Sequence, residues 1–256
     1  FSDPLLRRSA AMALSKFMAI SAQFCERNLK LLFTALLHAP DACLRANTIV
    51  ALGDLAFRFP NSIEPWTDML YAPLRDSDIG VRKNTLQVLS HLILNDMVKV
   101  KGKISDICVC LEDGDSRIKG LANLFFDELS KRHSNPIYNL LPDIISSLSR
   151  ADSVTPQCFQ DIMQYLMGPK FVKKEQQTLA LVEKLCQRFP ATFDCDLDVH
   201  TARNVAFCLQ SLKFDGSDKA VNKLIENKKF YKAVLGDDEV YNAFATIMKK
   251  MKKNSN

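Results

Sequence analysis

One short motif recurs at a nearly constant interval through the first half of the chain. It reads Asp-x-x-aliphatic-(Arg/Lys), and its copies span residues 3–7, 41–45, 78–82 and 115–119. The copies follow one another at steps of 38, 37 and 37 residues. Apolar residues keep the same 37-residue interval. One series precedes the Asp and consists of Leu37, Leu74, Leu111 and Leu148. Two series follow the Asp: the first is Leu52, Leu89 and Phe126, and the second is Leu55, Leu92 and Leu129. Three sets of positions with one period identify a repeat protein.

Each copy of the repeat contains two apolar stretches that are joined by a short polar turn. The turn Asp can cap the second stretch as a helix, because its side chain accepts hydrogen bonds from free backbone N–H groups. After the fourth turn, apolar residues fall on one helical face, at Ile118, Leu121, Ala122, Phe125, Phe126 and Leu129. Neither helix can bury such a face alone, so neighbouring pairs must stack. We therefore predict an all-α solenoid, a superhelix of antiparallel helix pairs.

The helix boundaries follow from this pattern and from the prolines. The predicted helices cover residues 4–24, 27–38, 41–59, 62–74, 78–95, 104–112, 115–133, 136–149, 156–167, 172–189, 198–212, 218–229 and 238–252. Residues 1–150 form regular repeats. Because Pro156 occupies the cation position of the next copy, we expect degenerate repeats and a cap over 151–256, within one continuous solenoid. The chain lacks an initiator Met and is already inside a repeat at Asp3, so we expect a piece of a longer solenoid.

The cation that ends each motif has two interpretations. In the first, it bonds the turn Asp or a helix-end carbonyl of an adjacent repeat, which produces a structural ladder. In the second, the cations form a row that faces a phosphate backbone or an acidic partner. An Asp accompanies the cation in every copy, which favours the ladder. Its predicted members are Asp3, Arg7, Asp41, Arg45, Asp78, Arg82, Asp115 and Lys119.

Other cations are candidates for contact with DNA or with a protein partner. They are Arg8, Lys83, Lys99, Lys101, Lys103, Lys131 and Arg132. The run from Lys99 to Lys103 is the strongest, since it surrounds Gly102 in a predicted loop without nearby acids. Taken alone, each cluster is more often a solvated face. We expect Trp66 to pack into the next repeat rather than to stack on a base.

The residues offer little support for catalysis. The 4 His are isolated, and no zinc, P-loop, dinucleotide or nucleophile-elbow motif is present. We therefore predict no enzyme activity, no catalytic residue, no metal site and no cofactor. The net charge of +5 allows anionic partners without requiring them.

The cysteines bear on the cellular compartment. Five of the 8 lie in helical patterns among apolar neighbours, where we expect reduced and packed thiols: Cys25, Cys43, Cys158, Cys186 and Cys208. That usage indicates the cytosol or nucleus. No apolar run reaches the 18 residues that would suggest a membrane span.

Five long strings carry a resemblance to a known family. They are SDPLLRRSA at 2–10, GDLAFRFPN at 53–61, HLILNDMVKVKG at 91–102, YNLLPDIIS at 138–146 and LVEKLCQRF at 181–189. They resemble the condensin complex subunit 1 family, the HEAT-repeat subunit of condensin I. The resemblance covers residues 2–190.

The resemblance implies a non-catalytic subunit of the ring-shaped complex that compacts mitotic chromosomes. In that family the SMC heads hydrolyse ATP and a kleisin chain threads along the HEAT subunit, which also contacts DNA. The implied partners are a kleisin, an SMC ATPase head, double-stranded DNA and histones, with no membrane. The implied location is the nucleus and chromosomes, with the cytoplasm in interphase. No family contact residue is assigned to a position in this chain.

Two other classes of HEAT protein remain open. One is another chromosomal subunit, from condensin II or a cohesin regulator, which shares the architecture. The other is a generic scaffold or a transport receptor. A transport receptor is expected to present an acidic inner surface to basic cargo, whereas this chain is net basic.

Overall fold

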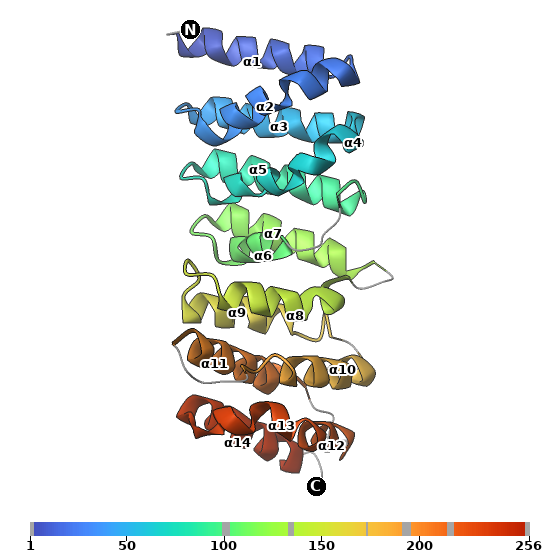
Figure 1. The fold of residues 1–256 in the computed structure, drawn as a ribbon, viewed down its shortest axis with the longest axis vertical. Helices are drawn as coiled ribbons and strands as arrows, with labels where there is room; N and C mark the ends of the chain where they lie inside the picture. Colours follow the sequence, from blue (N-terminus) through green and yellow to red (C-terminus); the bar gives the residue numbers. More distant parts are fainter. Residues whose placement is uncertain are drawn as a thin grey trace. The chain divides into compact units, whose positions relative to one another are not determined.

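The fold of the described residues is built from helices and turns alone. The computed structural model describes residues 3–98, 103–132, 136–172, 174–190, 196–213 and 218–253. These ranges contain no strand, so the predicted all-α class is confirmed (Figure 1). They belong to two compact units, residues 1–128 and 129–256. The expected division at residue 150 and the single continuous solenoid stay predictions.

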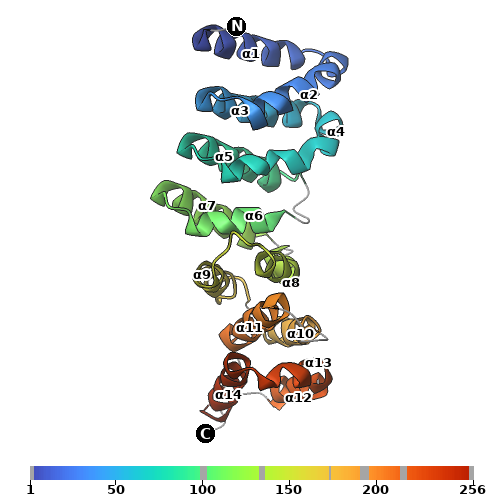
Figure 2. The same cartoon turned by 60° about the vertical axis from the view of Figure 1, so that its left-hand side comes forward.

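The first unit stacks helix pairs. Its elements, with 3-10 helices marked η, are α1 (Pro4–Met18), α2 (Ala22–His38), α3 (Ala42–Arg58), α4 (Pro60–Ile63), η1 (Glu64–Leu70), η2 (Ala72–Arg75), α5 (Ile79–Leu94), α6 (Ile104–Val109), η3 (Cys110–Glu112) and α7 (Ser116–Ser130). Within this unit α3 packs between α1 and α5. Figure 2 shows α3, α5 and α7 on one side and α2, α4 and α6 on the other. The second helices of the pairs thus share one face.

The turn aspartates begin these second helices. Asp41 accepts from the Cys43 N–H at 3.0 Å, and Asp78 accepts from the Val81 N–H at 3.0 Å. Asp3 and Asp115 cap α1 and α7 in the same way. The predicted capping role is confirmed, because an aspartate satisfies N–H groups that have no partner within the helix.

Prolines explain where the first helices of the pairs differ from prediction. The single helix expected over 62–74 is wrong, because the chain forms α4, η1 and η2 instead. Pro60, Pro65 and Pro73 each stand in the first turn of one of these short elements. Proline has no N–H to donate and clashes with the preceding turn, so a new element starts at each one.

The start of the chain differs from prediction as well. The expected helix over 4–24 ends at Met18, and α2 begins at Ala22. Ser21 has extended backbone, and its side chain caps α2 by accepting from the Phe24 N–H at 3.4 Å. The apolar pattern continues through this region, so only the cap marks the break.

The core of the first unit consists of the apolar positions that keep the repeat interval. Leu52, Leu89 and Phe126 are completely buried. Two buried threonines keep the interval too. Thr48 and Thr85 donate to helix carbonyls four residues earlier, at 2.7 and 2.8 Å. The hydroxyls are therefore satisfied inside an apolar core.

The second unit also consists of helices, with less regular joints. Its elements are α8 (Pro136–Ser149), α9 (Pro156–Leu166), α10 (Glu175–Cys186), α11 (Asp196–Ser211), α12 (Asp218–Glu226), α13 (Lys228–Tyr231), η4 (Lys232–Gly236) and α14 (Asp238–Lys253). Here α11 packs against α8, α9 and α14, while α10 packs against α12. Thr155, rather than the in-register Asp152, caps α9 and accepts from the Cys158 N–H at 3.2 Å.

The cysteines follow prediction in part. Cys25, Cys186 and Cys208 are buried free thiols, and burial raises the pKa of Cys186 to about 12. The packing predicted for Cys43 is wrong, since this residue lies exposed in the first turn of α3.

Candidate functional site

The first feature that could carry function is the row of charged residues along the turns of the first unit. Arg45 Nε and Nη2 both donate to the carboxylate of Asp76, each at 2.7 Å. Its Nη1 donates to the carbonyls of Ala39 and Pro40, at 2.7 and 3.3 Å. One guanidinium therefore closes its own turn and ties it to the turn of the next repeat.

The same arrangement recurs one repeat later. Arg82 donates to the carboxylate of Asp113 at 2.8 and 3.1 Å, and to the carbonyls of Asp76 and Ser77 at 2.9 and 3.2 Å. The side chains of Arg82 and Asp113 are 17% and 11% exposed. Bidentate pairs of this kind fix geometry as well as charge.

The burial of these pairs affects both partners. Burial alone would raise the pKa of Asp76, but hydrogen bonds from Arg45 and from the Asp78 N–H outweigh it, so this pKa lies below its ordinary value. The hydrogen bonds that Arg45 donates to Asp76 raise the pKa of Arg45. Both groups are therefore charged at neutral pH, and the row is a set of satisfied ion pairs.

The acids in this row are not the ones that the motif indicates. Asp78 and Asp115 cap helices, while Asp76 and Asp113, each two residues earlier, receive the arginines. Asp76 and Asp113 are 37 residues apart, but so are Asp78 and Asp115, and the repeat interval therefore does not tell which pair receives the arginines.

The first copy of the motif requires a correction. Ala39 stands 37 residues before Asp76, so no acid is available at that place. Asp41 takes the role, and the cation that reaches it is Arg8 rather than Arg7, with bonds of 2.5 and 2.8 Å. The Nε of Arg7 is buried and has no hydrogen-bond partner among the described residues. Arg8, a candidate for partner contact, is thus engaged inside the protein.

The cation of the fourth copy forms an ion pair within its own repeat. Lys119 donates to Glu112, which lies in the preceding element of its own repeat, at 2.9 Å. The position 37 residues after Asp113 is Arg150, so the sequence places no acid there. The regular series of acids ends with Asp113.

The second unit has charged joints that the motif does not predict. Arg203 on α11 donates to Asp237, which caps α14, with its shortest bond at 2.8 Å. The hydrogen bond from Arg203 holds the pKa of Asp237 below its ordinary value. Arg188 donates to Asp143 at 2.9 Å. The spacings of 34 and 45 residues share no period, which is why sequence comparison did not reveal them.

The other predicted contact cations lie in separate places. Lys83 is half-buried on α5, and Lys103 directly precedes α6. Lys131 and Arg132 follow the end of α7. Lys99 and Lys101 lie outside the described residues. A DNA contact through these cations stays a prediction.

Trp66 makes a contact between repeats. Its ring stacks on that of Phe33, with centroids 5.0 Å apart and planes 12° from parallel. Phe33 belongs to α2, so Trp66 packs onto the preceding repeat rather than the next one. One face of the ring is thus covered by Phe33, while the residue as a whole stays partly exposed.

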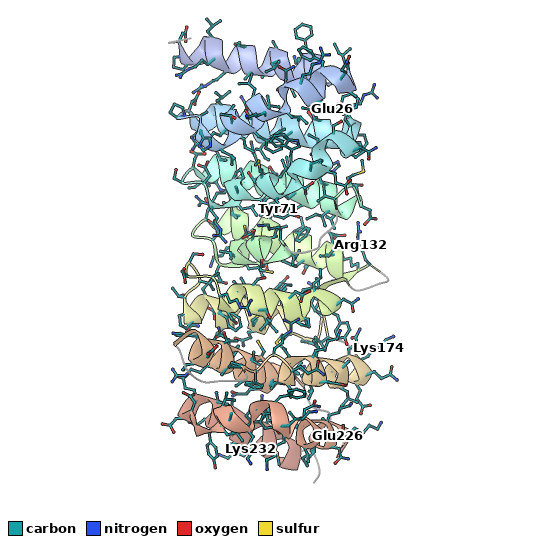
Figure 3. The ribbon with its side chains drawn as sticks, viewed as in Figure 1. Glu26, Tyr71, Arg132, Lys174, Glu226 and Lys232 are labelled. Atoms are coloured by element: carbon teal, nitrogen blue, oxygen red, sulfur yellow. The ribbon has the colours of Figure 1, made fainter. Side chains whose placement is uncertain are left out.

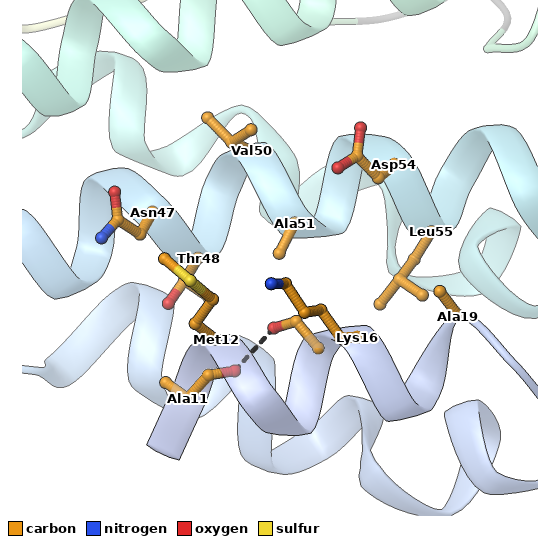
Figure 4. A pocket seen from close by; sticks show the side chains of 11 residues that line it. Ala11, Met12, Lys16, Ala19, Asn47, Thr48, Val50, Ala51, Asp54 and Leu55 are labelled. Atoms are coloured by element: carbon orange, nitrogen blue, oxygen red, sulfur yellow. Dashed lines mark hydrogen bonds between the residues drawn. The ribbon is translucent and has the colours of Figure 1, made fainter. Parts of the chain in front are cut away.

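The second feature is a cleft between α1 and α3 in the first unit. Its volume is about 350 Å³. Figure 4 shows Met12 and Lys16 on α1 facing Thr48, Ala51 and Leu55 on α3.

A neighbouring cleft continues between α3 and α5. It is larger, at about 620 Å³, and its lining includes Gly53, Phe57 and Val88. Gly53 brings the two helices close together, because a Cβ atom at that position would lie 2.7 Å from Val88 Cγ1. Both clefts therefore open on the face that the second helices of the pairs share.

The second unit has a cleft of different chemistry on α9, α11 and α14. Its volume is about 340 Å³. Its lining is mostly polar and charged, with Gln160, His200, Asn204, Gln210 and Glu239 among its members. The clefts of the two units therefore differ in chemistry.

The units also differ in charge. Residues 1–128 hold 15 Lys and Arg against 15 Asp and Glu, whereas residues 129–256 hold 19 against 14. The whole net charge of +5 thus belongs to the second unit. Lys174 and Lys232, labelled in Figure 3, are two of its exposed cations.

Metal binding requires a group of ligating side chains, and membrane spanning requires a long apolar helix. Across the described ranges, no group of three or more His, Cys, Asp or Glu side chains could hold a metal ion. No helix in those ranges is both long and apolar enough to cross a bilayer.

Comparison with known proteins places these features in a family. Residues 43–210 match the family described as non-SMC mitotic condensation complex subunit 1. The chain is 49% identical over 250 residues to the condensin-1 complex subunit CAP-D2 of Arabidopsis thaliana, an alignment that covers 98% of the chain. It is 45% and 43% identical over 256 residues to condensin complex subunit 1 of Xenopus laevis and of Homo sapiens, with 100% of the chain covered.

The relatives are much longer than this chain. The alignments cover 17% of the Arabidopsis protein and 18% of the Xenopus and human proteins. None of the three names refers to an enzymatic activity.

Proposed function

Because the chain belongs to the family of non-SMC mitotic condensation complex subunit 1, we propose that it is a non-catalytic HEAT-repeat scaffold of the condensin complex. It binds the kleisin chain and an SMC ATPase head, and it contacts double-stranded DNA during mitotic chromosome condensation. The observation that carries this proposal is the identity of 43% to 49% over essentially the whole chain.

The architecture supports a scaffold. Each repeat contacts mainly its neighbours, so small shifts at successive interfaces add up along the stack. The joints through Arg45 and Arg82 are bidentate, and they keep the turns in register while the helices adjust. Such a stack suits a subunit that must hold one partner and follow the movement of another.

DNA contact is supported by the charge of the second unit. An excess of cations attracts phosphate and releases counterions. Lys131 and Arg132 belong to this unit. The rest of the proposed set lies in the first unit and depends on local clusters of cations instead: Lys83, Lys99, Lys101 and Lys103. Arg8 leaves the set because Asp41 already neutralises it.

The chain acts in the nucleus and on chromosomes, and in the cytoplasm during interphase. Histones are a further proposed partner, bound together with DNA. The chain carries no catalytic, metal or cofactor site in this proposal. ATP hydrolysis belongs to the SMC head. The alternative is a subunit of condensin II or of another chromosomal HEAT complex, which would bind a different kleisin.

Co-purification with isolated kleisin and SMC-head fragments tests the scaffold. We expect the chain to retain the kleisin of condensin I in preference to that of condensin II. Retention of the condensin II kleisin alone would favour the alternative, and retention of neither would contradict the proposal.

A DNA shift assay at several salt concentrations tests the DNA contact. Charge reversal of Lys99, Lys101 and Lys103 together should weaken binding about tenfold or more and should flatten the salt dependence, because each lost phosphate contact removes a released counterion. Lys30→Glu, an exposed change on α2 outside the proposed set, is the control. Unchanged affinity in the triple variant would remove this segment from the DNA contact.

A further inference from the structure

The two clefts of the first unit form one groove, called here the α1–α3–α5 groove. They share Ala19, Val50 and Asp54 as lining residues. A molecule that lay across both clefts would contact three successive helices, each from a different repeat. The groove is therefore long enough for a segment of polypeptide and is not confined to one side chain.

The lining of the groove leaves large apolar side chains in solvent. Met12 is 50% exposed, Val50 is 42% exposed and Phe57 is 60% exposed. All three line the groove. Scattered single exposed apolar residues are ordinary, but a contiguous set along a concave lining is typical of a binding surface.

Charged residues are placed along the groove in alternating order. Lys16 lines the first cleft, Asp54 lines both clefts, and Arg58 lines the second. Neither Lys16 nor Asp54 forms an ion pair with another residue in the part of the chain that the structure describes. A partner that carried an acid, a base and an acid in the same order would satisfy all three.

This chemistry disfavours DNA in the groove. Lys16 and Arg58 would attract phosphates, but Asp54 between them would repel a continuous phosphate backbone. The apolar floor also has no counterpart on a sugar–phosphate backbone. A polypeptide with an apolar stripe fits both properties.

The spacing of the clefts indicates the conformation of that polypeptide. Packed helices lie about 8–10 Å apart, so the two clefts repeat at about that distance. On a helix, residues i and i+7 lie on one face about 10.5 Å apart. On a strand, successive residues of one face lie about 6.7 Å apart, which does not match.

The size of the clefts separates a helix from a polyproline segment. A polyproline helix also repeats at about 9.3 Å, but it presents a single side chain at each turn. The clefts of about 350 and 620 Å³ have room for more than one. An α-helix places two neighbouring side chains, at i and i+3 or i+4, in each cleft.

We propose that the α1–α3–α5 groove binds an amphipathic α-helix from another subunit of the same complex, with a basic residue of that helix paired to Asp54. The inference rests on the proposed function, because it takes the occupant from the assembled complex. The helix carries apolar residues at i, i+3 or i+4, and i+7, and acids that face Lys16 and Arg58.

Site-specific photocrosslinking in the complete complex tests the occupant. A benzophenone amino acid replaces Val50 in the full-length subunit, and the crosslinked peptide is identified by mass spectrometry. We expect a segment of a different subunit that has the predicted stripe. Leu31 on α2, which is 58% exposed and lines neither cleft, is the control position. It should give no crosslink to that segment.

Binding of the identified segment, as a synthetic peptide, to the full-length subunit then tests the contacts. Asp54→Lys should weaken binding about tenfold, and a peptide with its facing base changed to Glu should restore it. Phe57→Asp should weaken binding about tenfold or more, since it places a charge in the apolar floor. Leu124→Asp on α7, at a residue 57% exposed, should have no effect. All three positions are exposed, and circular dichroism reports whether each variant is folded.

The outcomes separate this inference from the proposed function. A complex that assembles while position 50 crosslinks to nothing, to DNA, or to another part of the same chain overturns the groove inference alone. A wild-type subunit that fails to enter the complex overturns the proposed function, and the occupant inferred here with it. An identified peptide whose binding ignores Asp54→Lys overturns the pairing.

Discussion

In the first unit, successive turns are joined twice by the same arrangement, whereas in the second unit the joints vary. Arg45–Asp76 and Arg82–Asp113 both span 31 residues. The pairs Arg203–Asp237 and Arg188–Asp143 span 34 and 45 residues. Both units nevertheless stack fully buried apolar residues. The difference teaches that apolar burial is sufficient for stacking, while the regular ion pairs fix the register of the turns.

The two units also differ in the polarity of their clefts and in their net charge. The second helices of the first unit expose apolar side chains along a groove in a unit with no net charge, while those of the second unit line a polar cleft in a basic unit. A shared scaffold therefore presents two kinds of surface. The first suits an amphipathic segment of protein, and the second suits polar or anionic partners.

The largest expected effect tests whether the units are stabilised separately. Leu89→Ala on α5 removes a completely buried side chain and should cost about 2–5 kcal/mol. Amide hydrogen exchange should increase in α5 and in α3, which packs against it, and should stay unchanged in α11 and α14.

Leu209→Ala on α11 is the matched change in the second unit, since this residue is also completely buried. It should increase exchange in α11 and α14 and leave α5 unchanged. Equal loss of protection across the whole chain in either variant would show that the two units unfold as one.

The next largest effect is expected at the ion pairs that join helices or turns, and it should differ between the two units. Asp76→Asn keeps the shape of the side chain but removes the charge that faces Arg45, at a pair whose side chains are 12% and 11% exposed. Loss of a charged hydrogen-bond partner at such a site should cost about 1.5–3 kcal/mol. Urea denaturation measures the change.

Asp237→Asn should cost less. Arg203 is 37% exposed and keeps a second partner, Glu239, at 2.8 Å. A cost for Asp237→Asn equal to that of Asp76→Asn would remove the distinction between the regular and the irregular joints.

The close approach of α3 and α5 gives a smaller effect with a predicted sign. Gly53→Ala places a Cβ against Val88 and should destabilise the first unit by about 1–3 kcal/mol, although alanine favours the helix by up to about 1 kcal/mol. Gly120→Ala on α7 meets no atom within 4 Å and should stabilise by about 0.5–1 kcal/mol.

The variant Gly53→Ala/Val88→Ala tests the cause of that effect. It should recover part of the loss, because the smaller side chain on α5 makes room for the new methyl group. Thermal denaturation measures the stability of this double variant and of the single variants Gly53→Ala and Gly120→Ala. A stabilising Gly53→Ala would show that α5 shifts without cost.

The smallest effect is on acid stability. The ion pair with Arg8 lowers the pKa of Asp41, that with Arg45 lowers the pKa of Asp76 against the effect of burial, and that with Arg117 lowers the pKa of Asp115 to about 2. A carboxylate with a lowered folded pKa stabilises the fold above its unfolded pKa of about 4, and this contribution is lost as the pH falls through the folded pKa.

We therefore expect the stability of the first unit to fall from about pH 4 toward pH 2, and to fall more than that of the second unit, where Asp237 is the lowered carboxylate of the joint. Hydrogen exchange at pH 5 and pH 3 measures the difference between the units. A steeper loss in the second unit would contradict the role given to the regular joints.

Much of the fold was accessible from the sequence, since its signals are local. The period of 37 residues placed α3, α5 and α7 directly after their capping aspartates. Helix capping depends on the residue and on the three that follow it. The break at Ser21 and the short elements that begin at Pro60 and near Pro65 were harder to predict from the sequence. In both regions the apolar pattern continues, and only a cap or a proline marks the end of the helix.

The candidate site was less accessible. The sequence indicated Arg8 and several clusters of cations. In the structure, Arg8 pairs with Asp41, and Val50 and Phe57 line a groove. Apolar residues on a helix are expected to face the core, so their sequence gives no sign that they lie in solvent.

The sequence by itself determined that this protein is a stack of helix pairs, where each second helix begins, and which family it belongs to. The tertiary structure alone decided that Asp76 and Asp113, rather than Asp78 and Asp115, receive the arginines, and that α1, α3 and α5 leave an apolar groove between them. The physical reason is one of range. Caps and helical periods are set by residues a few positions apart, whereas an ion pair across 31 residues and a groove across three helices depend on how the repeats are offset when they pack.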